Sequence, residues 1–140
     1  MTQATTVQKS ILINAPTAKV WHAITDPAMI KQLFFGTTVE SEWKVGGPIV
    51  YHGEWEGNSY IDKGTILQLE PEKRFQHTYW SSVSGTTDAP ENYATITYEI
   101  TQEGNQSRLA ITQDNVISEK TGDGWQQLLE NMKKILETNS

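Results

Sequence analysis

Residues 124–137 read GWQQLLENMKKILE and constrain the architecture of the whole chain. The large apolar residues of this segment recur every three or four positions, at Trp125, Leu128, Leu129, Met132, Ile135 and Leu136. This spacing predicts a long helix with one apolar stripe, capped by Asp123 or Ser118. Such a helix must bury its stripe against another element, so the preceding sequence determines the fold class.

The preceding sequence has the period of two that is typical of strands. Residues 93–102, YATITYEITQ, place Ala94, Ile96, Tyr98 and Ile100 on one face. A hairpin turn at residues 103–106 leads to a last strand, Leu109–Gln113. The same reasoning predicts five earlier strands: Val7–Ile13, Thr37–Trp43, Ile49–Trp55, Tyr60–Glu70 and Arg74–Trp80. Short turns join most of them, so we expect an antiparallel sheet.

Two short helices are predicted between the first and second strands. Pro16 suits the first turn of one helix, and Asp26 can cap a second one that Pro27 opens. The apolar residues Met29, Ile30, Leu33 and Phe34 give the second helix a buried side. The order of elements therefore predicts an α+β fold that occupies residues 1–140 as a single domain.

Composition excludes several functional classes. The 140 residues include no cysteine, which rules out a disulfide scaffold, a thiol nucleophile and a Cys-ligated zinc. Eleven Lys and Arg residues stand against 17 Asp and Glu residues, and the net charge of −6 disfavours nucleic acid and anionic membrane surfaces as partners. The sequence contains neither a bilayer-spanning apolar run nor a secretory signal, so the expected location is the cytoplasm.

Several motifs in order along the chain resemble one family. Ala15-Pro16, Val20-Trp21 and Thr25-Asp26-Pro27 resemble the opening of the activator of heat-shock-protein-90 ATPase homologue family, in the START-like, or birch-pollen-allergen-like, superfamily. The turn at residues 43–48, WKVGGP, is similar to that of the family. So are Gly64 with Leu69-Glu70-Pro71 and Arg74-Phe75, and Gly124-Trp125 at the final helix. Together these matches span residues 7–137.

The resemblance implies a helix-grip fold, in which a curved antiparallel sheet wraps the long C-terminal helix. A cavity between sheet and helix then holds an apolar molecule such as a lipid, a sterol or a polyketide. One departure is Leu33-Phe34-Phe35, where the family often has a Trp-aromatic pair. We expect this change to reshape one rim of the cavity.

Candidate ligand-binding residues follow from the strand faces and from the helix stripe. If the aromatic faces are concave, the pocket would be lined by Phe34, Tyr51, Trp55, Phe75, His77, Tyr79, Ile96, Tyr98, Trp125, Leu128 and Met132. The alternative is that these side chains fill an ordinary core. His77 could likewise be a core histidine bonded to a backbone carbonyl, rather than a polar contact for a ligand.

The sequence gives little support for catalysis. His22, His52 and His77 lack metal-ligand spacing, and no nucleophile elbow or phosphate-binding loop occurs, so no metal or cofactor is expected. His77 has no evident acid–base partner. We therefore expect a non-catalytic binding protein for an apolar or aromatic small molecule. Two alternatives are a module that stimulates a heat-shock protein ATPase, with a chaperone as partner, and an enzyme similar to polyketide cyclases or hydrolases.

Overall fold

Seven strands form one antiparallel sheet in the order β1-β7-β6-β5-β4-β3-β2. The computed structural model describes residues 5–34, 36–55, 57–83, 85–116 and 121–138. The strands are β1 Thr5–Ile13, β2 Thr38–Ser41, β3 Pro48–Trp55, β4 Asn58–Glu70, β5 Arg74–Ser81, β6 Ala94–Glu103 and β7 Gln106–Val116. The helices are α1 Thr17–Thr25, α2 Pro27–Leu33 and α3 Thr121–Thr138, with a short 3₁₀ turn at Pro90–Asn92. The predicted α+β fold is confirmed.

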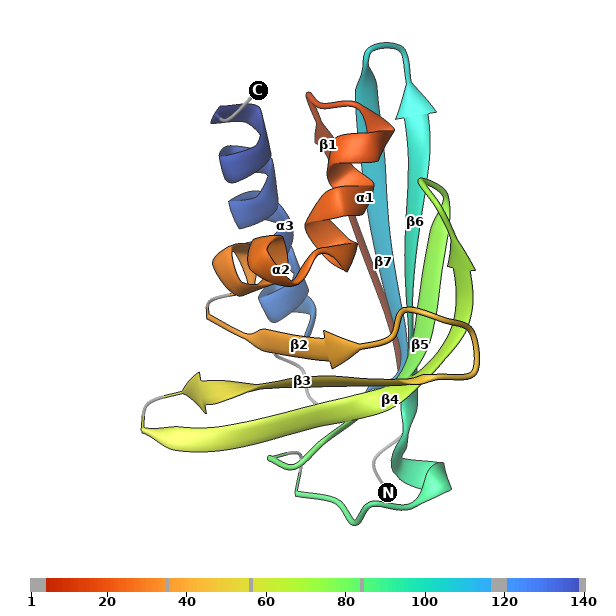
Figure 1. Ribbon diagram of the computed structural model, residues 1–140, viewed down its shortest axis with the longest axis vertical. Coiled ribbons are helices and arrows are strands. Elements are labelled where there is room, and N and C mark those ends of the chain that lie inside the picture. The colour runs from red at the N-terminus through yellow and green to blue at the C-terminus, as the bar shows by residue number, and fades with distance from the viewer. Residues whose placement is uncertain (1–4, 35, 56, 84, 117–120, 139–140) are drawn as a thin grey trace.

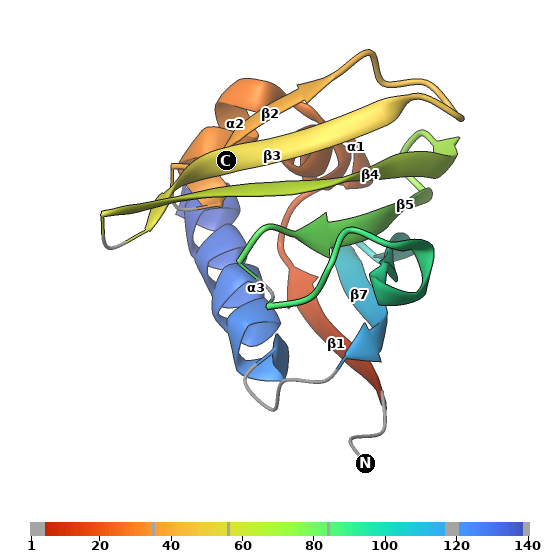
Figure 2. The same ribbon diagram turned by 90° about the horizontal axis from the view of Figure 1, so that it is seen from below.

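All three α-helices lie on one side of a strongly curved sheet. β1, β6 and β7 run roughly along α3, whereas β2, β3 and β4 turn across its lower end (Figure 1). The view from below shows the same strands curving around α3, with α1 and α2 beside it (Figure 2). The concave side of the sheet therefore faces the helices, as the resemblance implied.

Helix α3 buries the stripe that its spacing predicts. Leu128, Leu129, Met132 and Leu136 are at most 5% exposed, and they belong to the same core as Ile13 of β1. Trp125 and Ile135 pack at the edge of this core and are only half-buried. Among the described residues, no helix is both long enough and apolar enough to cross a bilayer.

Most strand bounds differ from the prediction by one or two residues, and the second and last strands differ most. The second strand ends at Ser41 rather than Trp43, because Trp43 has a φ of 53° and its backbone N–H bonds to the Ser41 hydroxyl at 2.9 Å. A left-handed residue interrupts the extended backbone, and apolar side-chain spacing does not reveal it. The last strand is longer than Leu109–Gln113, because β7 pairs with β1 as far as Val116.

β4 and β5 come very close together at Gly64. A Cβ atom at Gly64 would lie 1.7 Å from the Thr78 carbonyl oxygen. The pairing of the two strands then shifts by one residue between Ile66 and Gln68, which is a β-bulge. Up to this bulge, alternate residues of β4 face the helices, which determines the side chains available to a site.

Candidate functional site

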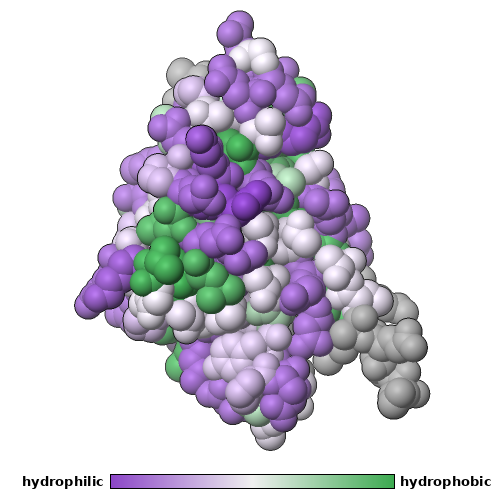
Figure 3. Space-filling view, turned by 90° about the vertical axis from the view of Figure 1, so that its right-hand side faces the viewer, coloured by the Kyte–Doolittle hydropathy of each residue, from purple (hydrophilic) through white to green (hydrophobic). Residues whose placement is uncertain are grey.

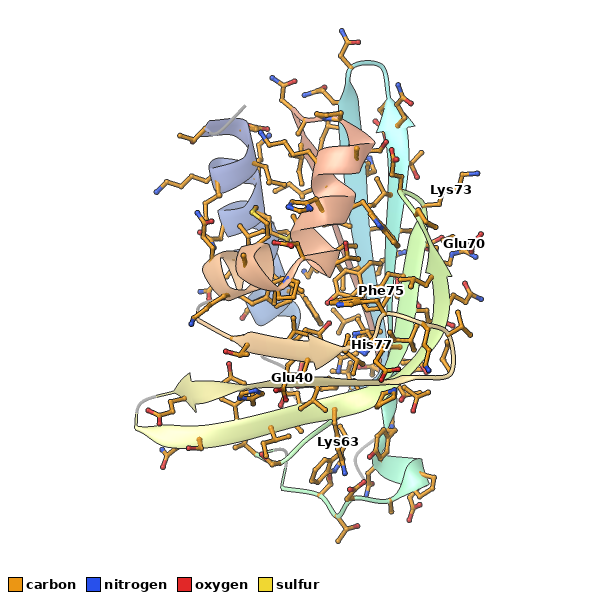
Figure 4. The ribbon with its side chains drawn as sticks, viewed as in Figure 1. Glu40, Lys63, Glu70, Lys73, Phe75 and His77 are labelled. Carbon is orange, nitrogen blue, oxygen red and sulfur yellow. The ribbon has the colours of Figure 1, made fainter. Side chains whose placement is uncertain are left out.

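A cavity of about 380 Å³ lies between the concave face of the sheet and the start of α3, and we call it the aromatic cavity. Cross-strand pairing brings its wall together: Tyr51 lies opposite Asp62, Asp62 lies opposite Ser81, and His77 lies opposite Ile96. Seven of the candidate residues line it: Phe34, Tyr51, His77, Tyr79, Ile96, Tyr98 and Trp125. Figure 4 shows His77 and Phe75 on the inner side of β5, whereas Lys63 of β4 projects away from it.

The aromatic rings of this region contact one another in sequence. Phe34 stacks on Tyr51 with ring centroids 6.3 Å apart, and His77 lies 5.8 Å from Tyr51 and 6.2 Å from Tyr98. Trp125 meets Tyr98 edge to face at 6.1 Å, and its indole N–H donates to the Gln113 side-chain oxygen at 2.8 Å. These contacts fix the rings, so the cavity has a preformed wall suited to another ring.

His77 is neutral at physiological pH. It is 2% exposed, and burial lowers its pKa to about 4 against the opposing effect of a hydrogen bond with Thr78. Nδ1 lies 2.7 Å from the Thr78 carbonyl oxygen, which can only accept, so Nδ1 carries the proton. Nε2 of the neutral ring is therefore an acceptor, and no described residue donates to it. The bond of His77 to a backbone carbonyl is present, and the ring also lines the cavity, while its contact with a ligand stays a prediction.

Asp62 places a carboxyl group in the wall of the same cavity. Oδ2 accepts a hydrogen bond from the Tyr79 hydroxyl at 3.3 Å, and the Ser81 side chain also bonds to this carboxyl group. Burial raises the pKa of Asp62, whereas the bonds to Ser81 and Tyr79 lower it. Oδ1 is buried and has no hydrogen-bond partner among the described residues. Burial also raises the pKa of Tyr51, with further contributions from Tyr98 and Asp62.

A second cavity of about 550 Å³ adjoins the first. The two share Phe34, Thr37, Tyr79, Ser81, Val83 and Trp125 as wall residues. The second cavity also includes Leu128 and more polar side chains, among them Asn92, Gln113 and Asn115. The combined space therefore passes from an aromatic end under β3 and β4 to a more polar end beside the start of α3.

Three candidate residues are not placed on the wall of the aromatic cavity or its neighbour. Phe75 and Met132 are 0% exposed and lie in the core, where Phe75 stacks on Tyr98 at 5.4 Å. Phe75 precedes His77 by two residues on the same strand, and its ring packs against Trp43 at 5.8 Å within the core. Met132 is two turns beyond Trp125 and is covered by the core. The side chain of Trp55 lies outside the described residues, as does Phe35.

Sequence reasoning missed five wall residues of the aromatic cavity: Thr37, Tyr60, Asp62, Ser81 and Val83. Asp62 is the most important of them because it brings a buried carboxyl group to the cavity wall. The signal was the alternation of Tyr60, Asp62 and Gly64, which must share one face of their strand. That signal was obscured because the opposite face carries Ile61 and Leu67, which are 49% and 41% exposed.

A metal centre has no structural support in the described part of the chain, where no three His, Cys, Asp or Glu residues cluster. The site instead combines fixed aromatic rings with two unpartnered acceptors, His77 Nε2 and Asp62 Oδ1. Such a site can enclose a ring by apolar contact and orient it by hydrogen bonds.

The fold and its cavity define the class of protein, a helix-grip domain of the START-like superfamily. Residues 14–137 match the family described as "Activator of Hsp90 ATPase homolog 1-like protein", and the chain belongs to that family. A comparison with curated proteins gave no match.

Solved structures agree with this assignment. ChR145 from Cytophaga hutchinsonii is 41% identical, with a TM-score of 0.83 over 99% of this chain and 97% of that one. PFC0360w, an HSP90 activator from Plasmodium falciparum, is 21% identical, with a TM-score of 0.74 over 94% and 96% of the two chains. DynU16, from the dynemicin biosynthetic locus, is 17% identical, with a TM-score of 0.78 over 97% of this chain and 48% of that one. The last two likenesses concern the fold alone.

Proposed function

We propose that this protein binds an apolar, ring-bearing small molecule in the aromatic cavity. The observation that carries the proposal is a preformed space of about 380 Å³ walled by the rings of Phe34, Tyr51, Tyr98 and Trp125, of which Phe34 stacks on Tyr51 and Trp125 meets Tyr98 edge to face. A ring that enters it leaves water for an apolar surface, which favours binding by roughly 25 cal/mol per Å² of buried apolar area. Sterol-like and polyketide-like molecules fit this description, as does a lipid that carries a ring.

The first test is native mass spectrometry of protein purified from its own host, followed by organic extraction. We expect a small molecule at near one-to-one stoichiometry that is released by solvent. A matched pair of variants locates it. Ile96→Trp enlarges a wall residue that is 2% exposed, whereas Ile61→Trp enlarges an exposed residue on the outer face of β4. Loss of the molecule from both variants, or from neither, would show that it does not bind in the aromatic cavity.

A second function follows from the family. Its description concerns activation of the Hsp90 ATPase, and the similar Plasmodium falciparum protein is itself an HSP90 activator. A coupled ATPase assay with the cognate chaperone tests this function. Stimulation at near-stoichiometric amounts, unchanged in Ile96→Trp, would favour a surface-driven chaperone role over ligand binding.

A further inference from the structure

Two buried acceptors in the aromatic cavity have no donor within the described part of the protein. His77 is only 2% exposed, and its Nε2 atom is buried. Asp62 Oδ1 is also buried and belongs to the wall of the same cavity. Buried polar atoms are nearly always hydrogen-bonded, so a pair of exceptions in one cavity needs an explanation. A bound molecule with its own donors would supply one.

The geometry assigns the same polarity to both groups. The His77 ring uses its Nδ1 proton on the Thr78 carbonyl, which leaves Nε2 able only to accept. Burial raises the pKa of the Asp62 carboxyl group, whereas the bonds from Ser81 and from the Tyr79 hydroxyl, which donates to Oδ2, lower it. In the ionised carboxylate, Oδ1 is a second acceptor and shares the negative charge.

We propose that the ligand of the aromatic cavity carries hydroxyl or N–H donors on its ring system, as a phenol does, and that the cavity rejects anionic ligands. This inference rests on the proposed function and narrows its ligand class. A donor on the ligand would pair with Asp62 Oδ1 or His77 Nε2, while the ring contacts Tyr51 and Tyr98. A carboxylate in the same position would meet two acceptors and a like charge.

The test compares three probes that share one ring system: 2-naphthol, its methyl ether, and 2-naphthoate. The dissociation constant of each is measured by isothermal titration calorimetry on the full chain at pH 7. We expect 2-naphthol to bind at least tenfold more tightly than the ether, because a site built to bond a hydroxyl group discriminates strongly against its absence. We expect 2-naphthoate to bind more weakly than the ether.

Variants assign the preference to the two acceptors. Asp62→Asn keeps the shape of the side chain and removes the charge, so we expect the preference for 2-naphthol over the ether to shrink at least fivefold and 2-naphthoate binding to improve. Glu54→Gln, an exposed carboxylate on β3, is the matched control and should match the unmodified protein. His77→Phe keeps a ring but removes Nε2, and it serves as a second test of the same preference.

The outcomes separate this inference from the proposed function. Equal affinity for 2-naphthol and its ether would overturn the donor requirement while leaving an aromatic binding site intact. A preference for 2-naphthol that survives unchanged in both Asp62→Asn and His77→Phe would also overturn it. If none of the three probes binds, the proposed function fails and the inference fails with it.

Discussion

At Gly64 the backbone of β4 lies against the Thr78 carbonyl of β5, and an added Cβ would be 1.7 Å from that oxygen. We expect Gly64→Ala to lower the free energy of unfolding by at least about 3 kcal/mol, because rigid backbone must move to relieve the overlap. The matched control is Gly124→Ala in α3, where nothing lies within 4 Å of the new Cβ. That change should raise the free energy of unfolding by about 0.5–1 kcal/mol. Urea denaturation monitored by circular dichroism measures both, and equal effects would contradict the close approach.

His77 should make stability depend on pH. The unfolded histidine takes up a proton near pH 6.5, whereas burial holds the folded one at a pKa of about 4. The folded state therefore binds fewer protons between these values, and the free energy of unfolding falls as the pH drops from about 6.5 to about 4. The free energy of unfolding lost in this way through His77 is about 3 kcal/mol. Above pH 6.5 the histidine is neutral in both states, so this loss is absent. The raised pKa of Asp62 acts in the opposite direction, while Tyr51, Tyr79 and Tyr98 of the same wall, whose pKa burial raises, stay neutral.

The check is urea unfolding at pH 7, 6 and 5 for the unmodified protein and His77→Phe. The difference in the free energy of unfolding between the two proteins should shift in favour of the variant as the pH falls. An identical pH dependence in both proteins would show that His77 titrates in the folded protein as it does in the unfolded chain.

Individual wall residues were only partly predictable from the sequence. Tyr98 and Ile96 were found because β6 alternates strictly between buried and half-buried positions, as a strand with one covered face must. Asp62 was not found, because hydropathy assigns a carboxylate to solvent and β4 exposes Ile61 and Leu67 instead. A core is recognised in a sequence by its apolar side chains, so a buried carboxyl group in a site escapes this rule.

Among the helices, α2 depends on the residue that caps its N-terminus. Asp26 accepts a hydrogen bond at 3.1 Å from the Met29 backbone N–H, and Pro27 opens the helix. We expect Asp26→Ala to lower the free energy of unfolding by about 1 kcal/mol, since one backbone donor loses its partner. Asp26→Asn keeps a capping oxygen and should cost much less. Because Phe34 on the cavity wall directly follows α2 as its C-cap, the alanine variant should also weaken 2-naphthol binding in calorimetry. Unchanged affinity would show that α2 does not shape the cavity.

The type and order of the elements were largely predictable, but the exact strand ends and the position of the β-bulge were not. The periods of two and 3.6 follow from burying one face of each strand and helix, so the order of strands and helices could be inferred from spacing. The end of β2 and the β-bulge between Ile66 and Gln68 depend on backbone conformation, which leaves no periodic trace. A bulge reverses the faces of all residues beyond it, so the inner face of β4 could not be extended from one end to the other.

For the molecule as a whole, binding in a central cavity should raise thermal stability. A ligand at a hundredfold excess over its dissociation constant adds about 2.7 kcal/mol to the free energy of unfolding. For 140 residues this is a rise in Tm of roughly 9 °C. Differential scanning calorimetry with 2-naphthol should show this shift in the unmodified protein and in Ile61→Trp, but not in Ile96→Trp. A shift that persists in Ile96→Trp would mean that the probe stabilises the protein from another site.

Figure 3 shows one face of the molecule, which is mainly polar and carries one larger hydrophobic patch with smaller apolar spots around it. Val45, Ile61, Leu67 and Val83 are the large apolar side chains exposed in the described part of the chain. Val83 also borders both cavities, so its exposure places it at their mouth. The apolar surface that matters for a ligand is thus largely internal, and a chaperone would meet mostly charged and polar groups on this face.

The position of β1 at the edge of the sheet, paired only with β7, has a kinetic consequence. Strand residues 5–13 find their partners at residues 107–116, about a hundred positions later. During synthesis β1 cannot pair with β7 until residues 107–116 have left the ribosome. Closing so long a loop is slow, so folding on the millisecond-to-second scale is expected. Because α3 packs on β1 and Trp125 of α3 lines the aromatic cavity, this cavity acquires its final wall only in this last step.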